Sequence, residues 1–98
     1  MAKYPRTGRW SNVRMRFLEE KRPDELKQMR ENGTLTEYLN KIEDEYHERF
    51  SKMEEEQLKK TQLEIRYGKK EIDWQTYISE FNQLRHNISE LLTEELCQ

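Results

Sequence analysis

The feature that most constrains this chain is a row of large apolar side chains that recur every three or four residues near its C-terminus. An α-helix turns once in 3.6 residues, so this spacing places the side chains on a single helical face. We therefore expect a long helix, opened by Asp73 as its N-cap, with its apolar face toward the protein core. The row consists of Trp74, Tyr77, Ile78, Phe81, Leu84, Ile88, Leu91 and Leu92.

A second row with the same spacing lies in the middle of the chain and predicts another long helix. The row weakens after Leu58, so this helix is expected to bend or end between Glu54 and Tyr67, with Gly68 as the stop. We interpret the aromatic residues of both rows as core, with part of the face left for a dimer or another partner. The second row comprises Leu35, Tyr38, Leu39, Ile42, Tyr46, Phe50 and Met53.

Two shorter helices are expected before these rows. Ser11 is a favoured N-cap residue for a helix over about residues 12–21, and Pro23 fits the first turn of the next helix. Gly33 is expected to end that helix, because glycine adopts the left-handed conformation without strain. No segment alternates at the period of two that is typical of strands. The predicted fold is therefore all-α, with two short N-terminal helices and a long antiparallel helical hairpin.

The length of the chain limits the number of domains, and its charged residues are unevenly distributed. Its 98 residues suffice for one domain. We expect a basic extended arm over residues 1–10 and a single helical domain over residues 11–98. Residues 1–16 hold five basic residues and no acidic one, whereas residues 17–98 hold 13 basic and 20 acidic residues. Only 33% of the residues are hydrophobic, so the core is expected to be thin. A thin core suits a few long helices packed side by side, or a surface that a partner completes.

The single cysteine, Cys97, has no second cysteine with which to form an internal disulfide. This favours a reducing cytoplasm as the location of the protein. No apolar run approaches the ~20 residues that a membrane-spanning helix requires, so no association with a membrane is expected.

No catalytic or phosphate-binding motif occurs in the sequence. His47 lies about one helical turn after Asp44, and Glu90 lies one turn after His86. A helical di-metal site, however, requires two Glu-x-x-His units and further carboxylates. We therefore expect a protein that is not an enzyme, with no catalytic residue, no metal and no other cofactor.

The basic arm combines positive charge with aromatic rings. Basic side chains contact phosphates and aromatic rings stack on bases, so the arm is a candidate for contact with nucleic acid or with an acidic partner surface. A tail that folds over the acidic helices of its own chain explains the same composition. The candidate residues are Lys3, Arg6, Arg9, Trp10, Arg14 and Arg16.

An acidic surface is expected on the central helix, because residues 34–58 hold eight acidic and three basic residues. Such a surface can imitate a phosphate backbone and occupy a basic groove, although a solubilising helix face has the same composition. Five basic residues between positions 59 and 70 interrupt the acidic run. The candidate partner-binding residues are Glu43, Asp44, Glu45, Glu48, Glu54, Glu55 and Glu56.

Several short motifs follow one another in a recognisable order. They are Arg14-Met15-Arg16, Leu18, Arg22-Pro23, Leu26, Gly33-x-Leu35, Tyr38-Leu39, Asn82-x-x-Arg85, Glu90 and Glu95-Leu96. Over about residues 12–96 this order resembles the TnpV family, small proteins encoded in transposons of Gram-positive bacteria. Residues 51–76 depart from the family pattern, and Trp74 lies a few residues earlier than the tryptophan of the family, with Tyr77 nearer that place.

The resemblance implies a mobile genetic element but no settled activity, so three functions stay open. The preferred one is an inhibitor of a host nucleic-acid-processing enzyme such as a CRISPR-associated nuclease. Such an anti-CRISPR protein would act through charged helical surfaces against the basic channel of the nuclease. The second is a DNA-binding accessory protein of transposition that uses the arm and the first two helices. The third is a helical dimerisation or regulatory module, in which the protein forms a homodimer.

Overall fold

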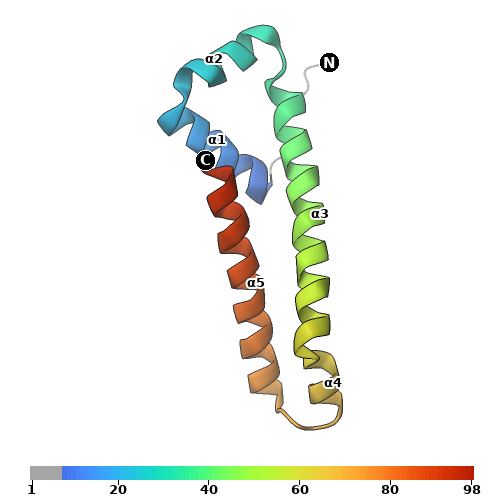
Figure 1. Ribbon diagram of the computed structural model, residues 1–98. Coiled ribbons are helices and arrows are strands. Elements are labelled where there is room, and N and C mark those ends of the chain that lie inside the picture. The colour runs from blue at the N-terminus through green and yellow to red at the C-terminus, as the bar shows by residue number, and fades with distance from the viewer. Residues whose placement is uncertain (1–7) are drawn as a thin grey trace. The chain divides into compact units, whose positions relative to one another are not determined.

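Figure 1 shows the computed structural model, which describes residues 8–98. Within this range the chain forms only helices and turns, so the predicted all-α class is confirmed. The helices are α1 (Arg9–Lys21), α2 (Pro23–Asn32), α3 (Leu35–Thr61), α4 (Leu63–Gly68) and α5 (Trp74–Leu96).

The chain divides into two compact units. Unit 1 consists of Met1–Glu48 and Thr93–Gln98, and unit 2 consists of Arg49–Leu92. Helices α3 and α5 therefore each contribute residues to both units. The single helical domain and the long antiparallel hairpin, which both concern the arrangement of these units, stay predictions.

The first helix begins earlier than expected, at Arg9, with Gly8 as its N-cap. The prediction that Ser11 caps this helix is wrong. Ser11 lies inside α1, is 2% exposed, and its hydroxyl donates a hydrogen bond to the Gly8 carbonyl at 3.2 Å. Arg9 and Trp10 are thus helical and do not belong to an extended arm, and residues 1–7 lie outside the described residues.

The ends of α2 follow the sequence signals. Pro23 occupies the first turn, where its missing N–H costs no helical hydrogen bond. Gly33 ends the helix in the left-handed region at a φ of 72°, and its N–H donates to the Arg30 carbonyl at 3.2 Å. Both predictions are confirmed.

The predicted interruption after the second apolar row occurs at Gln62, between α3 and α4. Gln62 has a φ of 51°, which breaks the helical path. In the residue directly before it, the Thr61 hydroxyl donates to the Gln57 carbonyl at 3.0 Å and lies 3.4 Å from the Leu58 carbonyl. Such bonds from a side chain to the preceding turn bend helices. The second helical piece, α4, ends at Gly68 as expected.

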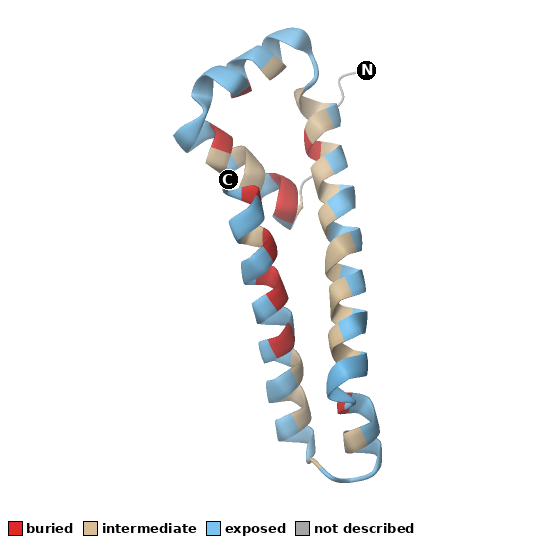
Figure 2. Ribbon diagram, in the orientation of Figure 1, coloured by how far each residue is buried: buried red, intermediate tan, exposed pale blue. Residues whose placement is uncertain are grey.

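Each unit has its own small core, visible as the buried positions in Figure 2. Two members of the apolar row on α5 are not core, however, because Trp74 is 57% exposed and Leu91 is 48% exposed. For these two residues the interpretation as core is wrong. The buried apolar residues are Trp10, Leu18, Leu26, Leu39 and Leu96 in unit 1, and Leu63, Leu84, Ile88 and Leu92 in unit 2.

Candidate interaction surfaces

Glu43, expected on a partner-binding surface, is instead engaged within unit 1. Its Oε2 accepts hydrogen bonds from the backbone N–H of Trp10 at 3.0 Å and of Ser11 at 3.1 Å. The first N–H groups of a helix have no partner in the helix itself and carry partial positive charge, so an acidic side chain is favourable there. Glu43 of α3 therefore caps α1 from a distance of more than 30 residues along the chain.

Gly8 makes room for this cap. A Cβ atom added at position 8 would overlap the carboxylate of Glu43. Any other residue at position 8 would therefore displace the carboxylate that accepts the two N–H groups of α1. Glycine at this position therefore allows the close approach of Glu43.

Arg14, expected in a basic surface, is also engaged within unit 1. Its Nε donates to the Tyr38 hydroxyl at 2.8 Å, and its Nη1 donates to the carbonyls of Leu96 and Gln98, each at 2.8 Å. The last carbonyls of a helix lack intrahelical partners and carry partial negative charge, so a guanidinium is favourable there. Arg14 thus joins α1 to the start of α3 and to the end of α5.

The other residues of the predicted basic arm that the structure describes differ in exposure. Trp10 is 4% exposed and its ring packs against Tyr46 at 6.2 Å. Arg9 is exposed, with its guanidinium 5.0 Å from the centre of the Trp10 ring, and Arg16 is exposed on α1. Lys3 and Arg6 lie outside the described residues.

Three of the predicted acidic residues are exposed in unit 1. Asp44, Glu45 and Glu48 follow Glu43 on α3, and we refer to these three as the acidic turn. Glu43 itself is half-buried because it faces α1. The structure therefore separates four neighbouring acidic residues into one capping residue and three surface residues.

The acidic residues of unit 2 are partly paired. Glu54 is half-buried, and its Oε2 lies 3.2 Å from Nε of Arg85. This is an ion-pair distance, although the buried Oε2 accepts no well-directed hydrogen bond among residues 8–98. Glu55 forms an exposed ion pair with Lys59 at 3.5 Å, and Glu56 is exposed.

Unit 2 also holds a surface that the apolar spacing did not identify. Four aromatic rings gather near the turn over residues 69–73, where α4 ends and α5 begins. We refer to these rings as the ring cluster. Trp74 and Tyr77 stack at 5.6 Å, Tyr77 and Phe81 at 6.1 Å, and Tyr67 lies 5.0 Å from Tyr77. The spacing on α5 placed three of these rings on one face correctly, but gave no sign that Trp74 and Tyr67 stay exposed. The ring cluster comprises Tyr67, Trp74, Tyr77 and Phe81.

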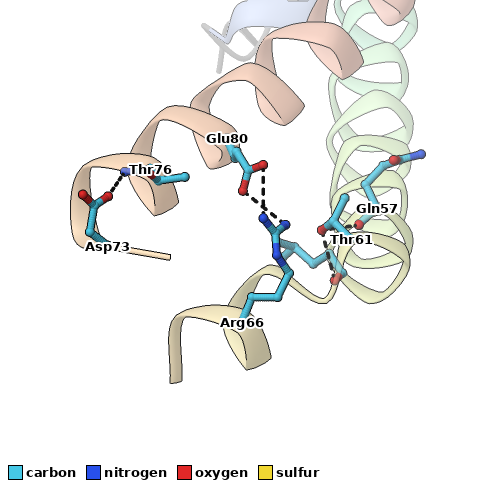
Figure 3. A network of polar contacts seen from close by, with 7 residues as sticks. Gln57, Thr61, Arg66, Asp73, Thr76 and Glu80 are labelled. Atoms are coloured by element: carbon cyan, nitrogen blue, oxygen red, sulfur yellow. Dashed lines mark hydrogen bonds and ion pairs between the residues drawn. The ribbon is translucent and has the colours of Figure 1, made fainter. Parts of the chain in front are cut away.

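Figure 3 shows the polar contact that joins α4 to α5 and the contact that caps α5. The guanidinium of Arg66 reaches from α4 to both carboxylate oxygens of Glu80 on α5, at 3.3 and 3.5 Å. Asp73 is the N-cap of α5, as predicted, and its Oδ1 accepts the backbone N–H of Thr76 at 2.7 Å. Hydrogen bonds from the side chain and then from the backbone of Thr76 lower the pKa of Asp73 below its ordinary value of 3.8.

Neither histidine is part of a metal-binding group. His47 is exposed, and Nε2 of His86 lies 3.1 Å from Glu90 in an exposed pair. Among residues 8–98, no three histidine, cysteine, aspartate or glutamate side chains are close enough together to hold a metal ion. None of the helices in this range is long and apolar enough to cross a bilayer.

These contacts define an all-α protein with one acidic and one aromatic surface on its helices. The chain belongs to the TnpV family, since the model of this family, described as "Transposon-encoded protein TnpV", matches residues 2–97. The resemblance drawn from the short motifs is thereby confirmed. No curated protein and no solved structure matches the chain.

Proposed function

We propose that this transposon-encoded protein is a non-catalytic binding protein that inhibits a nucleic-acid-processing protein of the host. A CRISPR-associated nuclease is the partner we favour. The acidic turn would occupy a basic surface that the nuclease uses to hold nucleic acid, in the manner of a phosphate mimic.

One observation carries this proposal, namely that the acidic turn is exposed while Glu43 beside it is not. Asp44 and Glu48 lie one helical turn apart on a rigid helix, so their carboxylates are presented without a large loss of conformational freedom on binding. The excess of acidic residues in unit 1 also favours a basic partner. The described part of unit 1 holds twelve acidic and eight basic residues.

The alternative as a DNA-binding accessory of transposition has less support from the same residues. Trp10 is buried and Arg14 is engaged with Tyr38 and with the end of α5. Neither side chain is available for nucleic acid without breaking contacts inside unit 1. The residues of the acidic turn, by contrast, are exposed.

A charge-reversal variant tests the proposal, and it retains Glu43 so that the cap of α1 stays intact. Glu45→Lys with Glu48→Lys is expected to abolish inhibition of target-DNA binding by a guide-loaded CRISPR nuclease. Reversal of two charges leaves like charges facing each other, which costs affinity and slows association. The measurement is DNA binding by the nuclease in a titration with each variant.

The matched control is Glu19→Lys with Glu20→Lys, two exposed acidic residues of α1. This control changes the net charge of the protein by the same amount, so it separates the position of the charges from their sum. Equal inhibition by both variants and by the unaltered protein contradicts a role of the acidic turn. Absence of inhibition by the unaltered protein contradicts the choice of nuclease.

A further inference from the structure

The ring cluster forms a surface in unit 2 that the acidic turn does not explain. Trp74 is 57% exposed and Tyr67 is 40% exposed, although large aromatic side chains contribute most to stability when buried. They are two of the four exposed large hydrophobic side chains among residues 8–98, and their ring centres lie 5.7 Å apart. Exposed apolar side chains concentrated in this way indicate a binding surface.

The shape of the ring cluster fits a flat ligand. The planes of Trp74 and Tyr77 differ by 17°, and those of Tyr77 and Phe81 by 12°, so the three rings form a nearly parallel series along α5. Tyr67 of α4 lies against this series, 5.7 Å from Trp74. Nucleobases are flat and stack on aromatic side chains regardless of sequence.

The ring cluster is also held in place before any ligand binds. The contact of Arg66 with Glu80 joins α4 to α5, and the Asp73 cap orders the first turn of α5, in which Trp74 is the first residue (Figure 3). A surface ordered in advance loses less conformational entropy when it binds.

The charges around the ring cluster are balanced, because the turn carries two lysines together with the acidic residues Glu71 and Asp73. Lys69 and Lys70 are exposed in the turn, and Lys70 has a φ of 62°, a conformation uncommon for residues other than glycine. Two nearby acidic residues are engaged within the unit, Asp73 as a cap and Glu80 with Arg66. The turn therefore offers about two phosphate contacts, so affinity for a nucleic acid has to come mainly from stacking.

We propose that the ring cluster binds single-stranded nucleic acid, with unpaired bases stacked on Trp74 and Tyr67 and the backbone phosphates beside Lys69 and Lys70. A duplex binds more weakly, because its bases are stacked on one another and offer no face to the rings. This activity goes beyond the inhibitor function and does not depend on the acidic turn.

The first test uses the fluorescence of Trp74. The chain has two tryptophans, so Trp74 is the single one in a Trp10→Phe variant. Titration with an oligothymidine of about ten nucleotides is expected to quench this fluorescence to saturation. This length lies within the roughly 4–16 nucleotides that one small single-strand-binding domain covers. A duplex of the same length is expected to quench it far less.

Substitutions in the otherwise unaltered chain locate the site. Trp74→Ala is expected to weaken binding of a labelled oligothymidine at least about fivefold, the lower end of the loss when one stacking ring is removed. Leu91→Ala is the matched control, since Leu91 is exposed to a similar degree on the same helix, and it is expected to bind normally. Lys69→Ala with Lys70→Gly is expected to lower the salt dependence by about one to two counterions.

Three results overturn the proposal. They are no quenching of Trp74 by oligothymidine, equal affinity of Trp74→Ala and the unaltered chain, and equal affinity for single strand and duplex. The first result assigns the exposed rings to a protein partner, because aromatic anchors are also typical of protein interfaces. None of the three bears on the inhibitor function, whose test changes residues of unit 1 alone.

Discussion

The two units each contain one tryptophan, and they use it in opposite ways. Trp10 of unit 1 is 4% exposed and packs against Tyr46, whereas Trp74 of unit 2 is 57% exposed within the ring cluster. In unit 1, residues predicted to lie on the surface, such as Trp10, Glu43 and Arg14, instead make contacts inside the unit. Unit 2 keeps apolar rings outside and holds them with polar contacts. The same residue type is therefore core in one unit and surface in the other.

The contacts of charged residues also differ between the two units. In unit 1, Glu43 and Arg14 reach to the ends of other helices and satisfy backbone groups there. In unit 2, Arg66 and Glu80 pair with each other at a partly exposed position. Ion pairs of that kind contribute little to stability, whereas hydrogen bonds between a charged group and the backbone contribute more. In unit 1 such hydrogen bonds join helices that are far apart in the chain, whereas in unit 2 the bond from the Thr76 N–H to Asp73 caps the helix that Asp73 itself precedes.

The largest effect that distinguishes the units is expected from truncation of the two tryptophans. Trp10→Ala removes a buried side chain and leaves a cavity, which lowers the free energy of unfolding by about 3–5 kcal/mol. Trp74→Ala is expected to lower it by about 1 kcal/mol or less, since mainly ring contacts are lost. Urea denaturation followed by circular dichroism measures both. Similar losses for the two variants would remove the contrast between a buried and an exposed tryptophan.

A smaller effect is expected from the cap that joins α3 to α1. Glu43→Ala leaves two backbone N–H groups of α1 without their acceptor, which lowers the free energy of unfolding by about 1–2 kcal/mol. Glu45→Ala changes the same residue type two positions later at an exposed site and is expected to cost less than about 0.5 kcal/mol.

Gly8→Ala provides an independent check on this cap. Its Cβ displaces the Glu43 carboxylate, so this variant is expected to reproduce most of the loss seen in Glu43→Ala. Combined with Glu43→Ala it should add little further loss, because both changes remove the same contact. Additive losses would show that the two substitutions act independently, and thus that Gly8→Ala does not act by displacing the Glu43 carboxylate.

The smallest effect concerns the pH dependence of unit 2. The pKa of Asp73 is lowered in the folded protein by hydrogen bonds from Thr76, so its contribution to stability is complete above the ordinary pKa of 3.8. This contribution is lost as the pH falls below 3.8 through the folded pKa. Asp73→Asn keeps a good capping residue without a titrating group, so this variant is expected to lose less stability on acidification.

Thermal melting of both proteins between about pH 5 and pH 2.5 measures this difference, and comparison with the variant cancels the titration of the other carboxylates. A parallel decline of both melting temperatures would contradict the role of Asp73. A steeper decline of the unaltered protein supports it.

Local signals in the sequence predicted the helices well, because each signal acts on its neighbours in the chain. Pro23 and Gly33 bound α2 and Asp73 opens α5, as expected from their backbone preferences and hydrogen-bonding groups. Gly68 is the last residue of α4, as expected, but the left-handed residue that follows this helix is Lys70. The start of α1 was missed because its cap comes from Glu43, a residue far away in the chain. No local pattern around Ser11 contains that information.

What the sequence by itself determined is the all-α class, most helix ends and the rows of apolar residues, since these depend on spacing and on neighbouring residues. The tertiary structure alone decided which members of each row and each charged group lie inside. Glu43 and Glu45 are the same residue type on one helix, yet only Glu43 meets the N-terminus of α1. Helical period assigns a residue to a face, and burial depends on what packs against that face at that level.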